Sequence, residues 1–188
     1  MIPAIPHGRR SGAADLERRH FAAPPWPRRV PPAVYAGLAI AAIGALGWAS
    51  GIPWLFPSLG PSIAIQSRSP EHPSARPWNV VVGHLIGAAV GFAVVRACGL
   101  IQEPAMNVSH ALTGARVVAA ALAVFLSMAL QDLAGANHAP AEATTLLIVV
   151  GALHADLRGA IVLVSGIALI ALFGEAVRRA KLERRAGG

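Results

Sequence analysis

Charged residues and cysteine are both scarce in this sequence. Only 13% of the 188 residues are charged, whereas an ordinary soluble domain carries about 25%. The single cysteine, Cys98, excludes an internal disulfide and removes the thiolate clusters that hold structural zinc. The chain also lacks a phosphate-binding glycine loop, a nucleophile elbow and an HExxH motif. We therefore expect no enzyme activity, no cofactor and no bound metal.

In place of charge, the sequence has long apolar windows. No Asp, Glu, Lys or Arg occurs in residues 30–67, 77–95, 117–131, 143–155 and 159–174. A helix needs about 20 mostly apolar residues to cross a bilayer, and one small soluble domain cannot bury so many all-round apolar helices. The sequence therefore predicts an all-α integral membrane protein with the lipid bilayer as its main partner.

The net charge of +7 is concentrated near the two ends of the sequence. Six arginines lie within residues 1–32, and four arginines and a lysine lie within residues 178–185. Basic residues that flank apolar spans follow the positive-inside rule, so we expect both termini in the cytoplasm and no nucleic-acid partner. We predict a disordered basic arm over residues 1–32, a transmembrane domain over 33–178 and a basic cytoplasmic tail over 179–188.

The apolar windows predict four full spans and two broken segments. The spans are expected over residues 34–50, 78–98, 113–130 and 160–177. The first broken segment, 51–66, contains Pro53, Pro57 and Pro61, which forbid one regular helix. Pro61 fits the first turn of a short helix that starts after Gly60. The second broken segment, 143–153, is too short for a comfortable helical crossing.

The order of these elements repeats at an offset of about 80 residues, as in Ala33 against Thr113 and Val80 against Ala160. Short or Pro/Gly-interrupted segments at matching positions of two halves indicate the binding site of a transporter. The segments either re-enter, which gives four crossings, or cross, which gives six. Helix length favours re-entrance, but the basic residues are divided between the two sides in the same numbers in both topologies, so the sequence leaves both open.

Three stretches of the first half carry a family resemblance: FPSLGPS at 56–62, SP at 69–70 with PSARPWN at 73–79, and GHLIG at 83–87. They resemble the pattern of the HPP family of integral membrane proteins, named for a His-Pro-Pro motif in the second half. The corresponding stretch here is HAPAEAT at 138–144, where Ala139 replaces the middle proline and Glu142 replaces a small residue. The resemblance implies a compact helical membrane domain. Some cyanobacterial and plastid relatives are described as nitrite transporters.

The candidate site combines the starts of the two short helices. Ser58, Gly60, Pro61 and Ser62 open the first, and Thr144 and Thr145 lie near the start of the second. Such a start presents unpaired N–H groups and the positive end of a helix dipole, which suits an anion. The structural alternative is that these residues only cap helices in a tight turn.

Histidines and polar residues beside these starts extend the candidate site. His84 and Asn79 lie in an apolar span, where an ionisable side chain usually faces the protein interior or a cavity. His84 suits anion contact or proton coupling, or else it only holds two helices together. His138 matches the family motif, and Arg76 either attracts anions or binds lipid headgroups. The acidic and histidine residues near His138 fit no closed zinc pattern, so polar loop positions are the simpler interpretation.

These patterns favour a transporter or channel for a small inorganic, nitrite-like anion in a bacterial inner membrane. One alternative is a membrane scaffold or sensor that does not transport. A weaker one is cation or proton transport that uses Glu142 and His84. Gly83, Gly87 and Gly91 predict a close-packing helix face. That face serves either helices of one chain or a homo-oligomer.

Overall fold

The computed structural model describes residues 30–186, and in that range it contains helices and no strand. Four helices are long and apolar enough to cross a membrane: α2 (Val30–Ser50), α4 (Pro77–Ala97), α6 (Gly114–Leu133) and α8 (Leu157–Ala186). Two half-length helices, α3 (Leu59–Arg68) and α7 (Ala141–Val149), alternate with them. The smaller elements are η2 (Pro73–Ala75), η3 (Leu100–Gln102) and α5 (Met106–Ser109). The prediction of an all-α integral membrane protein is confirmed.

The boundaries follow from local sequence. Pro77 opens α4, where its missing N–H costs nothing, and Thr113 caps α6 by accepting a hydrogen bond from the backbone N–H of Arg116 at 3.2 Å. Gly99 follows α4 at φ 69°, a left-handed conformation that favours glycine. Helix α3 begins at Leu59, so Pro61 lies within its first turn as predicted.

Helix α8 is longer than predicted and runs through Ala186. Residues 179–186, in the predicted basic tail, therefore continue the last helix beyond the predicted span 160–177. The i,i+3 and i,i+4 ion pairs of Glu175 with Arg178 and Arg179 support the helix there, at 2.5 and 2.7 Å. The predicted basic arm, apart from residues 30–32, lies outside the described residues.

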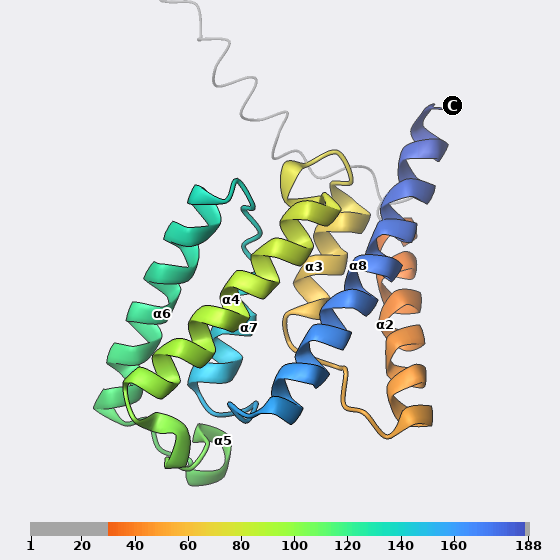
Figure 1. Cartoon of the computed structure of the whole chain (residues 1–188). Helices are drawn as coiled ribbons and strands as arrows, with labels where there is room; N and C mark the ends of the chain where they lie inside the picture. The colour runs from red at the N-terminus through yellow and green to blue at the C-terminus, as the bar shows by residue number, and fades with distance from the viewer. Residues whose placement is uncertain (1–29, 187–188) are drawn as a thin grey trace, which may run out of the picture. The chain divides into compact units, whose positions relative to one another are not determined.

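Each half-length helix completes a crossing together with the extended chain before it (Figure 1). The start of α2 and the end of α8 share one side of the domain, here named the terminal side. There Arg178 donates a hydrogen bond to the carbonyl of Pro70, in the α3–α4 turn, at 3.4 Å. Lys181 Nζ lies 5.1 Å from the ring centre of Tyr35, near the start of α2. The α3–α4 turn is therefore on the terminal side, which α3 reaches from the middle of the domain.

The second half has the same arrangement upside down. Helix α7 ends beside the α4–α6 connection on the opposite side, where Met106 N–H donates to the carbonyl of Val150 at 3.0 Å. Helices α2 and α4 run away from the terminal side, whereas α6 and α8 run toward it (Figure 1). Of the two topologies that the sequence left open, the structure has the one with six crossings. The halves form an inverted repeat.

The glycine face of α4 packs inside the chain, against α7. A Cβ atom at Gly83 would lie 2.8 Å from Cβ of His138, and one at Gly87 would lie 2.7 Å from Thr145 Oγ1. At Gly91 it would lie 3.1 Å from Ile148. Helix α8 makes a comparable close contact with α3, where Gly174 meets Gln66. Each half-length helix thus packs on the last span of the other half, which locks the two halves together.

Side-specific cysteine labelling tests this topology. The native Cys98 is exposed just beyond the end of α4, on the opposite side, and Glu183 is exposed near the end of α8, on the terminal side. We expect an impermeant maleimide to label Cys98 from one face of sealed vesicles. A Glu183→Cys variant that also carries Cys98→Ser should be labelled from the other face. If the half-length helices re-entered, both cysteines would be labelled from the same face.

Candidate functional site

A group of buried polar side chains lies where the two half-length helices begin. Ser58 immediately precedes α3, and Thr144 lies in the first turn of α7. The hydroxyl oxygens of these two residues are 2.9 Å apart. His84, in α4, lies seven residues from the helix start, which is about 10 Å along a helix that is about 30 Å long. The two half-length helices therefore start within the apolar interior, as the inverted repeat predicts.

Six residues, here named the histidine cluster, are joined by hydrogen bonds across four elements and the loop before α7: Ser58, Ser62, Ser74, His84, His138 and Thr144. The Ser62 hydroxyl lies 3.0 Å from Nε2 of His84 and 2.8 Å from Nε2 of His138. On the far side of each ring, Nδ1 of His84 lies 2.9 Å from Thr144 Oγ1, and Nδ1 of His138 lies 2.8 Å from the carbonyl of Ser74. All four ring nitrogens therefore have a partner.

The two imidazole rings lie edge to face. Their centres are 4.9 Å apart, and their planes are inclined by 65°. Both residues are only 1% exposed. Such burial in a membrane domain is costly for polar groups unless they are fully hydrogen-bonded, as they are here.

A second polar group lies on the other face of α7, toward α6. Glu142 Oε1 accepts hydrogen bonds from Ser127 at 3.0 Å and from Gln131 at 2.5 Å. Gln131 also accepts the backbone N–H of His138 at 3.0 Å, which links the two groups. Glu142 Oε2 is buried and has no hydrogen-bond partner among the described residues. The carboxyl group therefore faces α6 and not the histidine cluster.

The structure brings together five of the candidate residues: Ser58, Ser62, His84, His138 and Thr144. Asn79 is adjacent and donates to the carbonyl of Asn137 at 3.2 Å. Thr145 faces α6, where its hydroxyl lies 3.4 Å from Ser127 Oγ, and it also donates to the carbonyl of Ala141, one turn earlier in α7, at 3.3 Å. Gly60, Pro61 and Arg76 are exposed, the first two on other faces of α3 and the third in the α3–α4 turn. These three do not contact the cluster.

The expected free N–H groups at the helix starts are absent from the start of α7 in the structure. The backbone N–H groups of Ala141, Glu142 and Ala143 each donate to the carbonyl three residues earlier, at 2.8 to 3.2 Å. At α3, the N–H groups of Leu59 and Ser62 are also bonded, and Pro61 has none. The tight turns before the two helices therefore consume the three donors at α7 and those of Leu59 and Ser62 at α3. What remains for an anion is the helix dipole together with the hydroxyl and imidazole groups.

Sequence reasoning missed Ser74, Ser127, Gln131 and Arg116. Ser127 is the only hydroxyl within the apolar window 117–131, which was a usable signal. Ser74 and Gln131 belong to the site through contacts with distant parts of the chain, and no local sequence pattern predicts these contacts.

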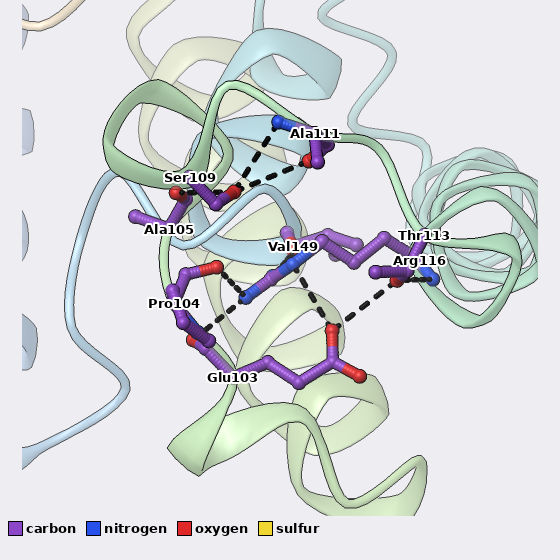
Figure 2. A network of polar contacts seen from close by, with 8 residues as sticks. All are labelled: Glu103, Pro104, Ala105, Ser109, Ala111, Thr113, Arg116 and Val149. Atoms are coloured by element: carbon purple, nitrogen blue, oxygen red, sulfur yellow. Dashed lines mark hydrogen bonds and ion pairs between the residues drawn. The ribbon is translucent and has the colours of Figure 1, made fainter.

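Arg116 forms a separate buried centre on the opposite side, shown in Figure 2. Its guanidinium donates to the carbonyl of Val149 at the end of α7, and to the carbonyls of Glu103 and Pro104 at 2.9 and 3.0 Å. Its Nε also lies 3.5 Å from the Glu103 carboxylate. A cation at this position satisfies carbonyls at the negative end of α7.

Two cavities bear on function. A cavity of about 10 Å³ lies between the cluster and α8, lined among others by Ser58, His84 and Gly166. That volume holds at most one water molecule. A larger depression of about 500 Å³ opens on the opposite side, beside Arg116, His154 and Asp156. Within residues 30–186, no three His, Cys, Asp or Glu side chains are grouped so as to hold a metal ion.

A family model described as "HPP, transmembrane region" matches residues 22–186. No match was found among curated proteins or among solved structures. The matched range includes every helix described above, and it contains both the FPSLGPS stretch and His138. The chain is an integral, multi-pass membrane protein that belongs to the HPP transmembrane family.

Proposed function

We propose that this protein is a transporter or channel for a small inorganic anion of the nitrite type. One observation carries the proposal: two half-length helices from inverted halves begin at the same buried polar cluster. In secondary transporters, substrate sites form where broken helices of inverted repeats meet near the middle of the membrane.

The chemistry of the cluster supports an anion as the substrate. Its side chains are hydroxyls and imidazoles, which donate hydrogen bonds, and the positive ends of both helix dipoles point toward it. The nearest carboxyl group, that of Glu142, is turned toward Ser127 and Gln131 on α6. A cation would lack a carboxylate ligand in the cluster.

Access requires movement, because the cavity of about 10 Å³ beside the cluster is too small for a triatomic anion. We place this movement at the contact between α3 and α8. The amide of Gln66 is fully buried there, and neither of its polar atoms has a hydrogen-bond partner among the described residues. A buried unpaired group costs about 1–3 kcal/mol. Separation of α3 from α8 would relieve that cost and expose the cluster.

The terminal side is assigned to the cytoplasm of a bacterial inner membrane. Among the residues whose side chains are described, the terminal side carries five basic residues: Arg68, Arg76, Arg178, Arg179 and Lys181. The opposite side carries three: Arg96, Arg116 and Arg158. The positive-inside rule favours the richer side as cytoplasmic.

Nitrite uptake into proteoliposomes tests the proposal. We expect uptake above that of empty vesicles for the wild type. Thr144→Val should reduce it at least tenfold, because valine keeps the shape but cannot hydrogen-bond His84 or Ser58. Thr144→Ser restores the hydroxyl and should recover most of the uptake, and Glu142→Gln should retain it. No uptake by the wild type at any pH would refute the anion proposal, and cation flux that depends on Glu142 would replace it.

A second candidate is a scaffold or sensor that does not transport, alone or as a homo-oligomer. The tightly packed centre favours it, because a scaffold has no need of an opening pathway. The same vesicles decide between the two. A scaffold gives wild-type vesicles that do not differ from empty ones for nitrite, other small anions and cations.

A further inference from the structure

The last turn of α3 buries an amide that has no hydrogen-bond partner. Gln66 is 0% exposed, and neither its Oε1 nor its Nε2 is bonded to any residue that the structure describes. Most buried polar groups of a folded protein are bonded, so an exception requires a physical explanation. Gln131 in α6 shows the usual arrangement, because its buried amide bonds Ser127, Glu142 and the backbone of His138. Gln66 thus holds unused hydrogen-bonding groups in the apolar interior.

Gln66 lies on the same face of α3 as the histidine cluster. Ser58, Ser62 and Gln66 follow one another at four-residue spacing, which places them on one face of the helix. All three are at most 3% exposed. One helical turn, about 6 Å, separates Ser62 from Gln66 in the direction of the terminal side. Along this face, the amide is therefore the next polar group beyond the cluster.

Helix α8 runs beside α3 and in the same direction (Figure 1). Ile170 lines the cavity beside the cluster, and Gly174 lies one turn further toward the terminal side. The Gln66 amide lies against Gly174, where a Cβ atom would overlap it. The amide therefore fills the space between α3 and α8 just beyond the cavity, and it closes the cavity toward the terminal side.

An aromatic side chain closes the same contact on the other side of the cavity. The Phe56 ring lies against Gly166, where a Cβ atom would overlap the ring, and both residues line the cavity. Gly166 precedes Gly174 by eight residues, which places it about 12 Å nearer the opposite side. The cavity beside the cluster is therefore closed at each end by a side chain that lies against a glycine of α8.

The repeat-related contact between α4 and α7 is built differently. A Cβ atom at Gly87 would lie 2.8 Å from the carbonyl oxygen of Ala141, and one at Gly91 would lie 3.2 Å from that of Thr145. Backbone meets backbone there, whereas the atoms nearest to the two glycines of α8 are the ends of side chains. Side chains rotate between staggered positions without moving a helix. Of the two contacts, that between α3 and α8 therefore opens at the lower cost.

An uncharged amide at this position suits an anion in transit. Its Nε2 donates hydrogen bonds but carries no charge, so it binds an anion without holding it as an arginine would. Arg178 lies one turn beyond Gly174 and donates to the carbonyl of Pro70 at 3.4 Å, while Glu175 pairs with it and offsets its charge. An anion that leaves the cluster toward the terminal side therefore meets the amide first.

We propose that Gln66 is a further anion-binding residue. It receives the anion between the histidine cluster and the terminal side, and its amide, lying against Gly174, closes that path when no anion is present. Phe56, lying against Gly166, closes the path toward the opposite side. The proposal rests on the proposed anion transport and names the residue through which that transport reaches the terminal side.

Gln66→Met separates this role from a structural one. Methionine keeps the length and flexibility of the side chain and removes both unpaired groups, so the melting temperature in detergent should rise by about 2 °C or more. Nitrite uptake into proteoliposomes should fall at least tenfold, because this part of the path loses its donor. Gln131→Met is the matched control for stability. It removes an amide that has partners, and it should lower the melting temperature.

Two results of this experiment would overturn the proposal. A lower melting temperature of Gln66→Met would show that the amide is bonded in the folded protein. A higher melting temperature with unchanged uptake would remove Gln66 from the path. A residue with a structural role alone cannot give the expected combination, in which stability rises while uptake falls.

Cysteine accessibility tests the path without any nitrite transport. In a Cys98→Ser background, Gln66→Cys is treated with sulfonatoethyl methanethiosulfonate, an anionic thiol reagent, in unsealed membranes where the reagent reaches both sides. We expect it to react at least tenfold faster than Ile148→Cys. Ile148 is the matched control because it is 1% exposed and packs against Gly91 in the α4–α7 contact. Equal protection of the two cysteines would contradict an opening between α3 and α8.

The failure of this proposal and the failure of anion transport give different results. Nitrite uptake that is the same in the wild type and in Gln66→Met leaves anion transport standing and refutes the role of Gln66. A wild type that moves no nitrite refutes anion transport and with it the anion-binding role. Rapid labelling of Gln66→Cys would in that case show an opening between α3 and α8 that serves another purpose.

Discussion

Gly87→Val is expected to destabilise the domain by about 3 kcal/mol or more, the upper end of the cost of overpacking a core. A Cβ atom there would lie 2.7 Å from Thr145 Oγ1 and 2.8 Å from the carbonyl oxygen of Ala141, distances at which one of the atoms must move. The carbonyl belongs to the backbone of α7 and cannot rotate away. Valine adds two further methyl groups to the same contact, so α4 and α7 must separate.

Thermal melting of the detergent-solubilised protein, followed by gel filtration, measures this effect. Gly37→Val in α2 is the matched control, because a Cβ at Gly37 has no atom within 4 Å. It should change the stability by less than about 0.5 kcal/mol. Thr145→Ala should rescue Gly87→Val only in part, since the Ala141 carbonyl remains. Equal melting of the Gly87 and Gly37 variants would contradict the α4–α7 packing described here.

The long spans were predictable because the physical signal is local. An apolar window free of charge is sufficient to identify a membrane helix, and the predicted span 78–98 differs from α4 (Pro77–Ala97) by one residue at each end. The start of α3 was predictable for the same reason, since Pro61 permits a helix only if it lies in the first turn. These elements depend on neighbouring residues alone.

The number of crossings was not predictable from helix length. Helix α3 has 10 residues and spans only about 15 Å, which favoured re-entrance. The rest of the crossing is made by residues 51–58, where extended chain covers up to about 3.3 Å per residue. Lipid would normally forbid such chain, but tight turns satisfy the N–H groups of Ile52, Trp54 and Phe56. A length rule that counts helices alone misses this contribution.

The sequence predicted most residues of the candidate site, but it did not predict which residues they hydrogen-bond. Ser58 and Ser62 are four residues apart and share one face of a helix, whereas Gly60 and Pro61 lie on other faces. Helical spacing therefore separates the residues that reach the cluster from those that do not. The bonds from Ser62 to His138 and from His84 to Thr144 join positions at least 60 residues apart, and no sequence pattern specifies such contacts.

Two buried polar centres hold α7 in place, one at each end of the helix. The histidine cluster fixes its start, and Arg116 fixes its end, on the opposite side of the domain. Helix α7 has only nine residues and gains little from its own hydrogen bonds. Its position is therefore set by these two centres and by the glycine face of α4. A substitution that removes the contacts at one end of α7 should also displace the residues at its other end.

Arg116→Leu is expected to destabilise the domain by about 3 kcal/mol, because each buried backbone carbonyl that is left without a donor costs about 1–3 kcal/mol. Arg116 is 2% exposed, and three backbone carbonyls and the Glu103 carboxylate depend on its guanidinium. Leucine fills much of the space and supplies no donor. Arg116→Lys should recover only part of the loss, because one ammonium cannot reproduce the planar set of donors that spans these carbonyls.

Arg158→Leu is the matched control, since Arg158 is an exposed arginine on the same side of the domain. It should leave the melting temperature nearly unchanged. The Arg116→Leu variant should also lose nitrite uptake, because release of the α7 end lets Thr144 move away from Ser58 and His84. This loss is expected even for the fraction of the variant that stays folded in detergent and is then reconstituted into vesicles. Full stability of Arg116→Leu would show that the carbonyls at the end of α7 find other donors, and would remove Arg116 as the anchor of that helix.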